Sequence, residues 1–332
     1  CNLYFALDDL TPDELSKVSF MAQLFGSLDT EKHALADLSR EIRSLFGNIR
    51  FTIEAYGQQN APARCRTFLC VSCSVLDAKL EKALSFLTEL LTGQRWENSD
   101  QVLAFLRQQR AAMAEQMVMA GHSAAMSRVL ACSTAEGAVQ EQASGITFLR
   151  WLAELEQDFP ARFPALAEDL KALSRRVFCR ARVTISVTAG NESSAGATAQ
   201  MMSDRLPEGN FLLPRTASIP PWKSRREGIV IPSGVSYAVL GGVFPEAGRG
   251  TAKVMGRTVS LAHVTGVQTV CSSDLPTCGT RCGFRAGPTA REWFCGTPAS
   301  RDFTPTATPA PPGPWTATGP PLTSCGALRI WT

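Results

Sequence analysis

The sequence carries little net charge and lacks long apolar runs. Lys and Arg number 33 against 30 Asp and Glu, so the formal net charge is only +3 over 332 residues. A balance this small gives no argument for nucleic acid or an anionic membrane as a partner. No apolar run reaches the length of a membrane span, and no secretory signal opens the chain. The chain starts at Cys1 with a strand-like stretch directly after it, so we expect a truncated N-terminus.

Histidine is scarce, and the common catalytic motifs are missing. The three histidines are His33, His122 and His263, and none stands in an HxxEH or HExxH spacing. GxSxG, P-loop and GxGxxG motifs are absent. His122, in AGHSAAM, is the best placed for a site, but a partly buried helix histidine with a backbone partner is the more ordinary interpretation. Taken alone, the residues contain no recognisable catalytic set.

The cysteines suggest core positions more than a metal site. Cys65, Cys70 and Cys73 form C-x4-C-x2-C without a fourth ligand nearby. Alternation along one strand sends Cys70 and Cys73 to opposite faces, so we interpret them as strand-core cysteines of a reducing compartment, the cytoplasm. A competing hypothesis is a zinc-binding domain that uses the late cysteines, Cys271, Cys278, Cys282 and Cys295.

One basic cluster stands out in a Pro-rich connector. It consists of Lys223, Arg225 and Arg226. A solvated loop is the plainer interpretation, and a contact for an anionic partner is the alternative.

The first 263 residues alternate between strand and helix patterns. A short strand, NLYFAL, precedes a helix at 12–25 that opens with a capping box of Thr11 and Glu14, with Pro12 at N1. Alternating apolar residues predict an antiparallel strand pair at 49–55 and 66–75. The other expected elements are helices at 30–45, 77–93 and 191–207, four or five helical segments over 99–176, a strand at 181–190, two short strands at 228–242 and a helix at 250–263.

The order of these elements and several phrases resemble a known family. The stretch 4–57, the phrases AGHSAAM, SGITFLRWLAELEQDF and RVTISVTAG, and the run from IVIPSGVSYAVLGG to VMGRTVSLAH are similar to presequence-protease-like zinc metallopeptidases. These enzymes belong to the pitrilysin/insulinase (inverzincin) family, and the resemblance covers essentially residues 2–263. It implies four homologous α/β domains in two halves, which are joined by a helical hairpin and close around a peptide.

The resemblance also implies where the zinc chemistry belongs. In the family, the HxxEH histidines and the glutamate base lie in the first domain, and this sequence resembles the C-terminal half. That half completes the chamber and lends an Arg and a Tyr, in a motif close to RxxGGAYG, that bind substrate and help stabilise the oxyanion. If the motif abuts CGFRAG, Asp274 occupies the Arg position and Thr280 the Tyr position. We therefore expect no catalytic, metal-binding or substrate-binding residue to be retained in this chain.

The stretch VTGVQTVCSSDL, at 264–275, has neither a helical period nor strand alternation. A common sequencing-library adapter encodes the same residues, so our hypothesis is that this stretch is translated adapter. Residues 276–289 then form a junction with an in-frame remnant, and 290–332 form a frameshifted, disordered tail rich in Pro, Thr and Ala. A genuine disordered Pro-rich tail is the alternative.

These observations predict an α+β fold with two pitrilysin-like domains, each a mixed or antiparallel sheet packed with helices, joined by a helical region. Residues 1–176 are expected to form the third domain of the family together with the hairpin region. Residues 177–263 are expected to form the start of the fourth domain, which is incomplete.

The expected function is the non-catalytic C-terminal half of a zinc-dependent oligopeptide-degrading metalloendopeptidase, and this chain alone is expected to be inactive. Zinc is expected in the missing N-terminal half, which is the expected partner together with peptide substrates. The alternative is a naturally non-catalytic scaffold or partner subunit. Exposed apolar surface on the incomplete domain predicts poor solubility.

Overall fold

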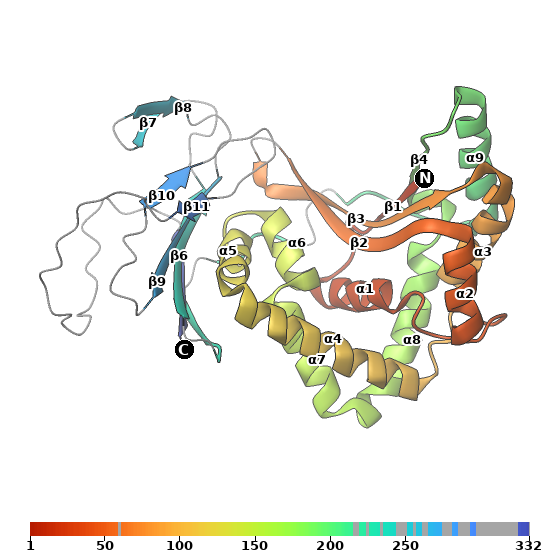
Figure 1. Cartoon of the computed structure of the whole chain (residues 1–332), viewed down its shortest axis with the longest axis horizontal. Helices are drawn as coiled ribbons and strands as arrows, with labels where there is room; N and C mark the ends of the chain where they lie inside the picture. Colours follow the sequence, from red (N-terminus) through yellow and green to blue (C-terminus); the bar gives the residue numbers. More distant parts are fainter. Residues whose placement is uncertain are drawn as a thin grey trace, which may run out of the picture. The chain divides into compact units, whose positions relative to one another are not determined.

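The computed structural model shows an α+β protein (Figure 1). The structure describes residues 1–58, 61–214, 219–223, 226–232, 235–243, 251–254, 257–260, 265–273, 281–284, 293–296 and 325–331. The chain divides into two compact units. The first comprises Cys1–Met119 and Thr134–Trp222, and the second comprises Ala120–Ser133 and Lys223–Thr332.

The first unit contains a four-stranded antiparallel sheet. Its strands are β1 (Asn2–Ala6), β2 (Phe46–Gln58), β3 (Ala61–Val75) and β4 (Val183–Ser186), in the order β2-β3-β1-β4. The strand at the N-terminus and the antiparallel pair of β2 and β3 are as predicted from alternation. Leu3 and Phe5 of β1 are fully buried, as are Leu69 and Val71 of β3, because alternate residues of each strand face the helices.

Helices cover one face of this sheet (Figure 1). Helices α1 (Pro12–Leu24), α2 (Leu35–Leu45) and α6 (Ala135–Ser144) contact its strands. Helices α3 (Leu80–Thr92), α4 (Ser99–Met119), α7 (Ile146–Gln157) and α8 (Phe159–Val177) pack against these or against one another, while α9 (Glu192–Arg205) packs near α3 and β4. Short 3-10 turns stand at Asp77–Lys79 and Arg180–Arg182. The predicted capping box of α1 is present, since Thr11 accepts from the Glu14 amide and Glu14 accepts from the Thr11 amide.

The second helix starts later than the sequence indicates. The pattern predicted a helix from residue 30, but α2 begins at Leu35. Thr30 instead forms an isolated bridge with Gln94, and its hydroxyl accepts from the His33 amide. The Asp29 carboxylate accepts from the amide of Leu35, the first residue of α2. Residues 29–34 therefore form a turn that leads into the helix.

Aromatic side chains join the sheet to the end of α8. The rings of Phe5 and Phe178 meet edge-on with centroids 5.1 Å apart, and Phe25 lies 5.5 Å from Phe178. Phe5 and Phe178 are fully buried. Burying aromatic side chains of this size is a large favourable term, so this cluster is a centre of the core of the first unit.

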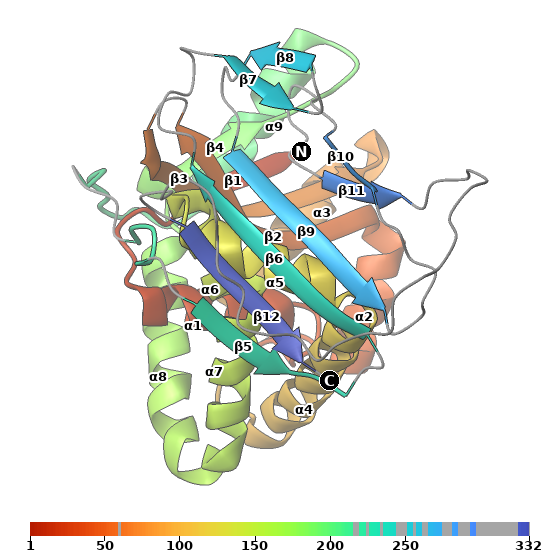
Figure 2. The same ribbon diagram turned by 90° about the vertical axis from the view of Figure 1, so that its left-hand side faces the viewer.

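The second unit is built around a mixed sheet and one helix. Its strands β5 (Arg226–Val230), β6 (Val235–Val243), β9 (Thr265–Ser273) and β12 (Cys325–Trp331) follow the order β5-β12-β6-β9 (Figure 2). Only β5 and β12 are parallel among these pairs. Helix α5 (Gly121–Ala131) packs on β6, and Arg128 makes a two-pronged ion pair with Glu227 of β5.

Three expectations for the second unit need correction. The helix predicted at 250–263 is wrong, because β7 (Thr251–Val254) and β8 (Arg257–Ser260) form an antiparallel pair. β-branched residues are frequent there and favour extended backbone. The stretch 264–275 was expected to lack strand structure, yet it contains β9. Within the tail expected at 290–332, the described residues form β11 (Trp293–Gly296), paired with β10 (Arg281–Phe284), and β12, so these two segments are strands, and the expected disorder of the other tail residues stays a prediction. The adapter and frameshift hypotheses themselves stay predictions.

The boundary expected at residue 176 does not coincide with the boundary between the compact units. Strand β4 was expected to open the second α/β unit, but it pairs with β1 in the first. Helix α5 lies within the expected first domain in sequence, but it belongs to the second compact unit. The assignment of the two segments to the third and fourth domains of the family stays a prediction.

Candidate functional site

The structure places the histidines apart from one another. His33 Nδ1 lies 2.7 Å from Glu89 Oε1, which also accepts from the Thr30 hydroxyl. His122 lies in α5 with its ring centroid 5.7 Å from that of Tyr237, and His263 lies outside the described residues. Within the part of the chain that the structure describes, no group of three or more His, Cys, Asp or Glu side chains is arranged to hold a metal ion.

The early cysteines line the first sheet, as the alternation of β3 predicts. Cys70 and Cys73 are buried in β3, and Cys65 is half-buried near the start of that strand. Burial raises the pKa of all three thiols, that of Cys70 to about 11. They are therefore neutral at physiological pH, which makes them poor nucleophiles and poor metal ligands.

The other predicted positions fall mostly beyond the described residues. Asp274, Thr280, Arg225 and Cys278 lie outside them. Lys223 and Arg226 are exposed, as expected for a solvated cluster. The backbones of β10 and β11 place Cys282 opposite Cys295, and Cys271 lies in β9.

A pocket lies beside the hairpin of β2 and β3. Its volume is about 490 Å³. Apolar side chains from three parts of the first unit line it, among them Leu7, Leu10, Val139 and Ile219. Polar groups converge on it from the hairpin and from the turn after β1, among them Asp8, Arg64, Cys65 and Arg66. Such a mixture of apolar lining and few polar groups is typical of ligand sites, so this pocket is the candidate functional site.

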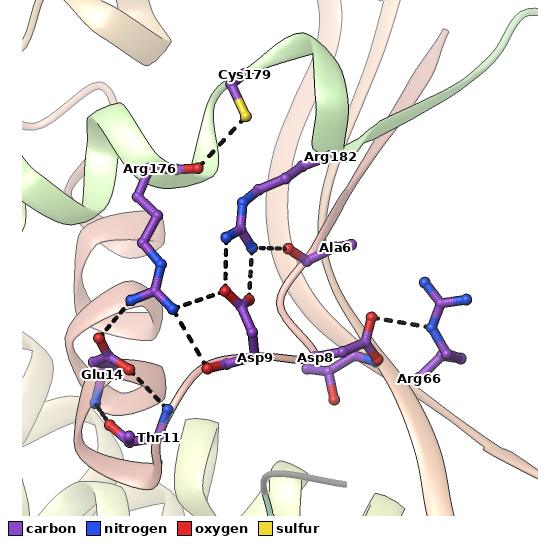
Figure 3. Close-up of polar contacts among 10 residues, drawn as sticks. Ala6, Asp8, Asp9, Thr11, Glu14, Arg66, Arg176, Cys179 and Arg182 are labelled. Carbon is purple, nitrogen blue, oxygen red and sulfur yellow. Dashed lines mark hydrogen bonds and ion pairs between the residues drawn. The ribbon is translucent and has the colours of Figure 1, made fainter. Parts of the chain in front are cut away.

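Two consecutive aspartates in the turn after β1 hold this site together. Asp8 Oδ1 accepts from the Thr67 amide and Asp8 Oδ2 from Arg66 Nε, each at 3.0 Å (Figure 3). The carboxylate of Asp8 is only 6% exposed. These bonds fix the turn to β3 at the edge of the pocket.

The second aspartate binds the end of the helical region. Arg182 holds Asp9 with two bonds, Nη1 to Oδ1 at 2.6 Å and Nη2 to Oδ2 at 2.7 Å, and Arg182 Nη1 also donates to the Ala6 carbonyl. Arg176 donates to Asp9 and to Glu14 (Figure 3). The two-pronged geometry is the strongest form of an Arg–carboxylate pair. The adjacent aspartates therefore join the hairpin, β1 and the end of α8 around one turn.

The Asp9 carboxylate should make stability depend on pH. Burial raises its pKa, but hydrogen bonds from Arg182 and Arg176 outweigh this and lower it to about 2. A lowered folded-state pKa stabilises the fold above the ordinary value near 4, and this stabilisation is lost as pH falls toward 2. The side chain is 24% exposed, so after a discount for solvent screening we expect a loss of about 1 kcal/mol.

Urea unfolding between pH 5 and pH 2.5 measures this contribution. The free energy of unfolding should fall more steeply in the natural chain than in Asp9→Asn, which cannot titrate at this position. Equal slopes for the two proteins would show that Asp9 makes no such contribution.

Sequence reasoning missed this site. The sequence shows two aspartates after a strand, which is an ordinary turn signal. Arg66, the partner of Asp8, follows 58 residues later, and Arg176 and Arg182, the partners of Asp9, follow 167 and 173 residues later, so no local pattern connects them. Among the helices of the described residues, none is long and apolar enough to cross a membrane.

Comparisons of the sequence with known proteins point to one family. Residues 1–155 match the family model described as peptidase M16 C-associated. Protein HypA of Clostridium perfringens (strain 13 / Type A) is 24% identical over 191 residues, which cover 58% of this chain and 19% of that protein. Presequence protease 1, chloroplastic/mitochondrial, of Arabidopsis thaliana is 25% identical over 180 residues, which cover 52% of this chain and 16% of that protein. The chain thus matches less than a fifth of the length of either relative.

Solved structures are also similar to this chain. A peptidase M16 inactive domain from Pseudomonas fluorescens aligns with a TM-score of 0.46 and 18% identity, over 72% of this chain and 53% of that one. A conserved protein from Enterococcus faecalis V583 aligns with a TM-score of 0.46 and 13% identity, over 72% and 55%. The sequence matches support the M16 peptidase family.

Proposed function

We propose that the chain is the non-catalytic C-terminal half of a zinc-dependent metalloendopeptidase that degrades oligopeptides. In this role it completes a chamber around the peptide, and the N-terminal catalytic half of the same polypeptide is its partner. The match of residues 1–155 to the peptidase M16 C-associated family carries this proposal. The name of the relative Presequence protease 1 supports a peptidase as the parent enzyme.

The side chains that the structure describes do not fit a zinc site. No suitable group of ligands exists among the described side chains, and the early thiols have raised pKa values. We therefore assign the chain no step of peptide hydrolysis, and zinc belongs to the catalytic half. The free early cysteines favour a reducing compartment, and we propose the cytoplasm.

A naturally non-catalytic scaffold or partner subunit is the second candidate. A scaffold would have the same fold and would equally lack a group of zinc-binding side chains among the described residues. The two candidates therefore differ only in the polypeptide with which the chain assembles. A partner subunit would join a separate polypeptide, whereas the C-terminal half would join a zinc-bearing segment encoded in the same gene.

Reconstitution tests the proposal. The full chain should release no product from an unfolded oligopeptide and should hold far less than one zinc per molecule by elemental analysis. Added to a separately produced, zinc-bearing catalytic half, it should raise the rate of cleavage at least tenfold. Cleavage or stoichiometric zinc in the chain alone would overturn the proposal. Stable assembly without any gain in cleavage would favour the scaffold.

A further inference from the structure

The candidate pocket carries more positive than negative charge. Its charged lining residues, in the part of the chain that the structure describes, are Asp8, Arg64 and Arg66. Asp8 and Arg66 neutralise each other, because Arg66 Nε donates to Asp8 Oδ2 at 3.0 Å (Figure 3). The Cys65 thiol adds no negative charge, since burial raises its pKa. Arg64 therefore supplies a net positive charge to the pocket.

Arg64 is the cation that is open to a ligand. It is exposed, and it forms no ion pair with another described side chain. Arg66, by contrast, is held by Asp8. The acidic Glu136 lies against Gly57 and does not line the pocket. An anionic ligand would therefore find its partner in Arg64.

The pocket also has an apolar lining, part of which is exposed. Leu7, Leu10 and Val139 are its buried apolar residues near the hairpin. Leu213 and Tyr56 line it as well, although they are 54% and 49% exposed. Large apolar side chains that lie exposed beside a cavity are stabilised when an apolar group of a ligand covers them. The pocket thus combines an unpaired cation with apolar surface that a ligand would cover.

This combination fits a ligand with an apolar group and a carboxylate. A guanidinium binds a carboxylate through two parallel hydrogen bonds. An ammonium group would instead meet the surplus positive charge, because the two oxygens of Asp8 already accept from Arg66 and from the Thr67 amide. The pocket volume of about 490 Å³ lies within the range of small-ligand sites. It can hold the end of a peptide but not a folded domain.

We propose that the pocket beside the β2–β3 hairpin binds an apolar group that carries a carboxylate, with Arg64 as its ion-pair partner. Two sources supply this chemistry, the C-terminal residue of a peptide and a free apolar acid. The inference deepens the proposed function and rests on it for the choice between them, because each cleavage of an oligopeptide creates a new C-terminal carboxylate. A peptide that ends in a large apolar residue such as leucine is then the expected ligand.

Fluorescence anisotropy with the full chain tests this inference. The probe is a pentapeptide with a label at its N-terminus and leucine at its C-terminus, and we expect saturable binding. The same peptide with a C-terminal amide should bind about tenfold more weakly, because it lacks the charge that pairs with Arg64. A peptide that ends in glycine should also bind more weakly, because it leaves the apolar lining uncovered.

Two matched variants assign the effect to one arginine. Arg64→Met should remove most of the difference in affinity between the acid and the amide peptides. Arg50→Met is the control, because Arg50 is an exposed arginine of β2 that does not line the pocket. It should keep the full difference. Both substitutions replace exposed side chains, so both variants should fold.

Competition distinguishes the two sources of the ligand. The competitor is 4-methylpentanoic acid, which is leucine without its amino group and therefore contains no peptide bond. We expect the unlabelled peptide to displace the probe at a much lower concentration than this acid does. Equal competition would assign the pocket to a free apolar acid.

Equal binding of the acid and amide peptides, an unchanged preference in Arg64→Met, or no binding at all would overturn the inference. Failure of reconstitution together with Arg64-dependent binding would instead overturn the proposed function and leave a binding module for apolar carboxylates. A gain in cleavage on reconstitution without such binding would remove this inference and leave the proposed function in place.

Discussion

Replacement of Arg182 by methionine should lower the free energy of unfolding by about 3–5 kcal/mol, because it leaves a carboxylate without its main partner. The Arg182 side chain is 3% exposed and makes two bonds to Asp9 and one to the Ala6 carbonyl. Its guanidinium also lies 4.6 Å from the centroid of the Phe211 ring. Urea unfolding at pH 7 measures the change.

Arg176 provides a matched control within the same network. Its side chain is 38% exposed and binds Asp9 and Glu14 near solvent, so Arg176→Met should cost no more than about 1 kcal/mol. Arg182→Lys should restore only part of the loss, since an ammonium group cannot form the two-pronged pair. Equal costs for Arg182→Met and Arg176→Met would contradict the account of a buried anchor.

Replacement of Gly145 by alanine should cost about 3 kcal/mol, although its backbone is ordinary. Gly145 lies between α6 and α7 with φ −90° and ψ −161°, which other residues adopt. An added Cβ would lie 2.0 Å from Glu141 Oε2, however. Glu141 is fully buried, and its Oε1 accepts from the Thr147 amide at the start of α7. The substitution therefore combines overpacking with the loss of a buried hydrogen bond.

Gly196 is the matched control for this substitution. It lies exposed within α9, and nothing stands within 4 Å of an added Cβ. Gly196→Ala should raise the free energy of unfolding by about 0.5–1 kcal/mol, because alanine favours helix. Thermal or urea unfolding compares the two variants. A cost below roughly 0.5 kcal/mol for Gly145→Ala, which is the scatter of neutral substitutions, would show that Glu141 can move aside freely.

Local patterns predicted much of the first unit. The capping box of α1, the alternation in β2 and β3, and the helical period over α4–α8 each follow from residues close in sequence. Gly145 directly precedes α7, and Pro160 lies in the first turn of α8. These signals are local because helices and hairpins are stabilised by nearby residues.

Long-range pairing lay beyond such patterns. Nothing near Val183 indicates that β4 pairs with β1, nor that α5 belongs to the second unit. At 250–263 the apolar spacing suggested a helix, while β-branched residues favoured β7 and β8. The candidate site depends on Asp8 and Asp9, whose partners come from distant segments. Sequence alone could predict the turn but not what it joins.

Sequencing the source locus across both ends of the chain tests the central claim most directly. We predict that the reading frame continues upstream of Cys1 into a domain with an HxxEH motif, and that VTGVQTVCSSDL is replaced by a stretch with the RxxGGAYG motif. The chain is then the non-catalytic half of a zinc peptidase. A start codon near Cys1, with the sequence of residues 264–275 intact, would contradict this account and leave a non-catalytic binding module.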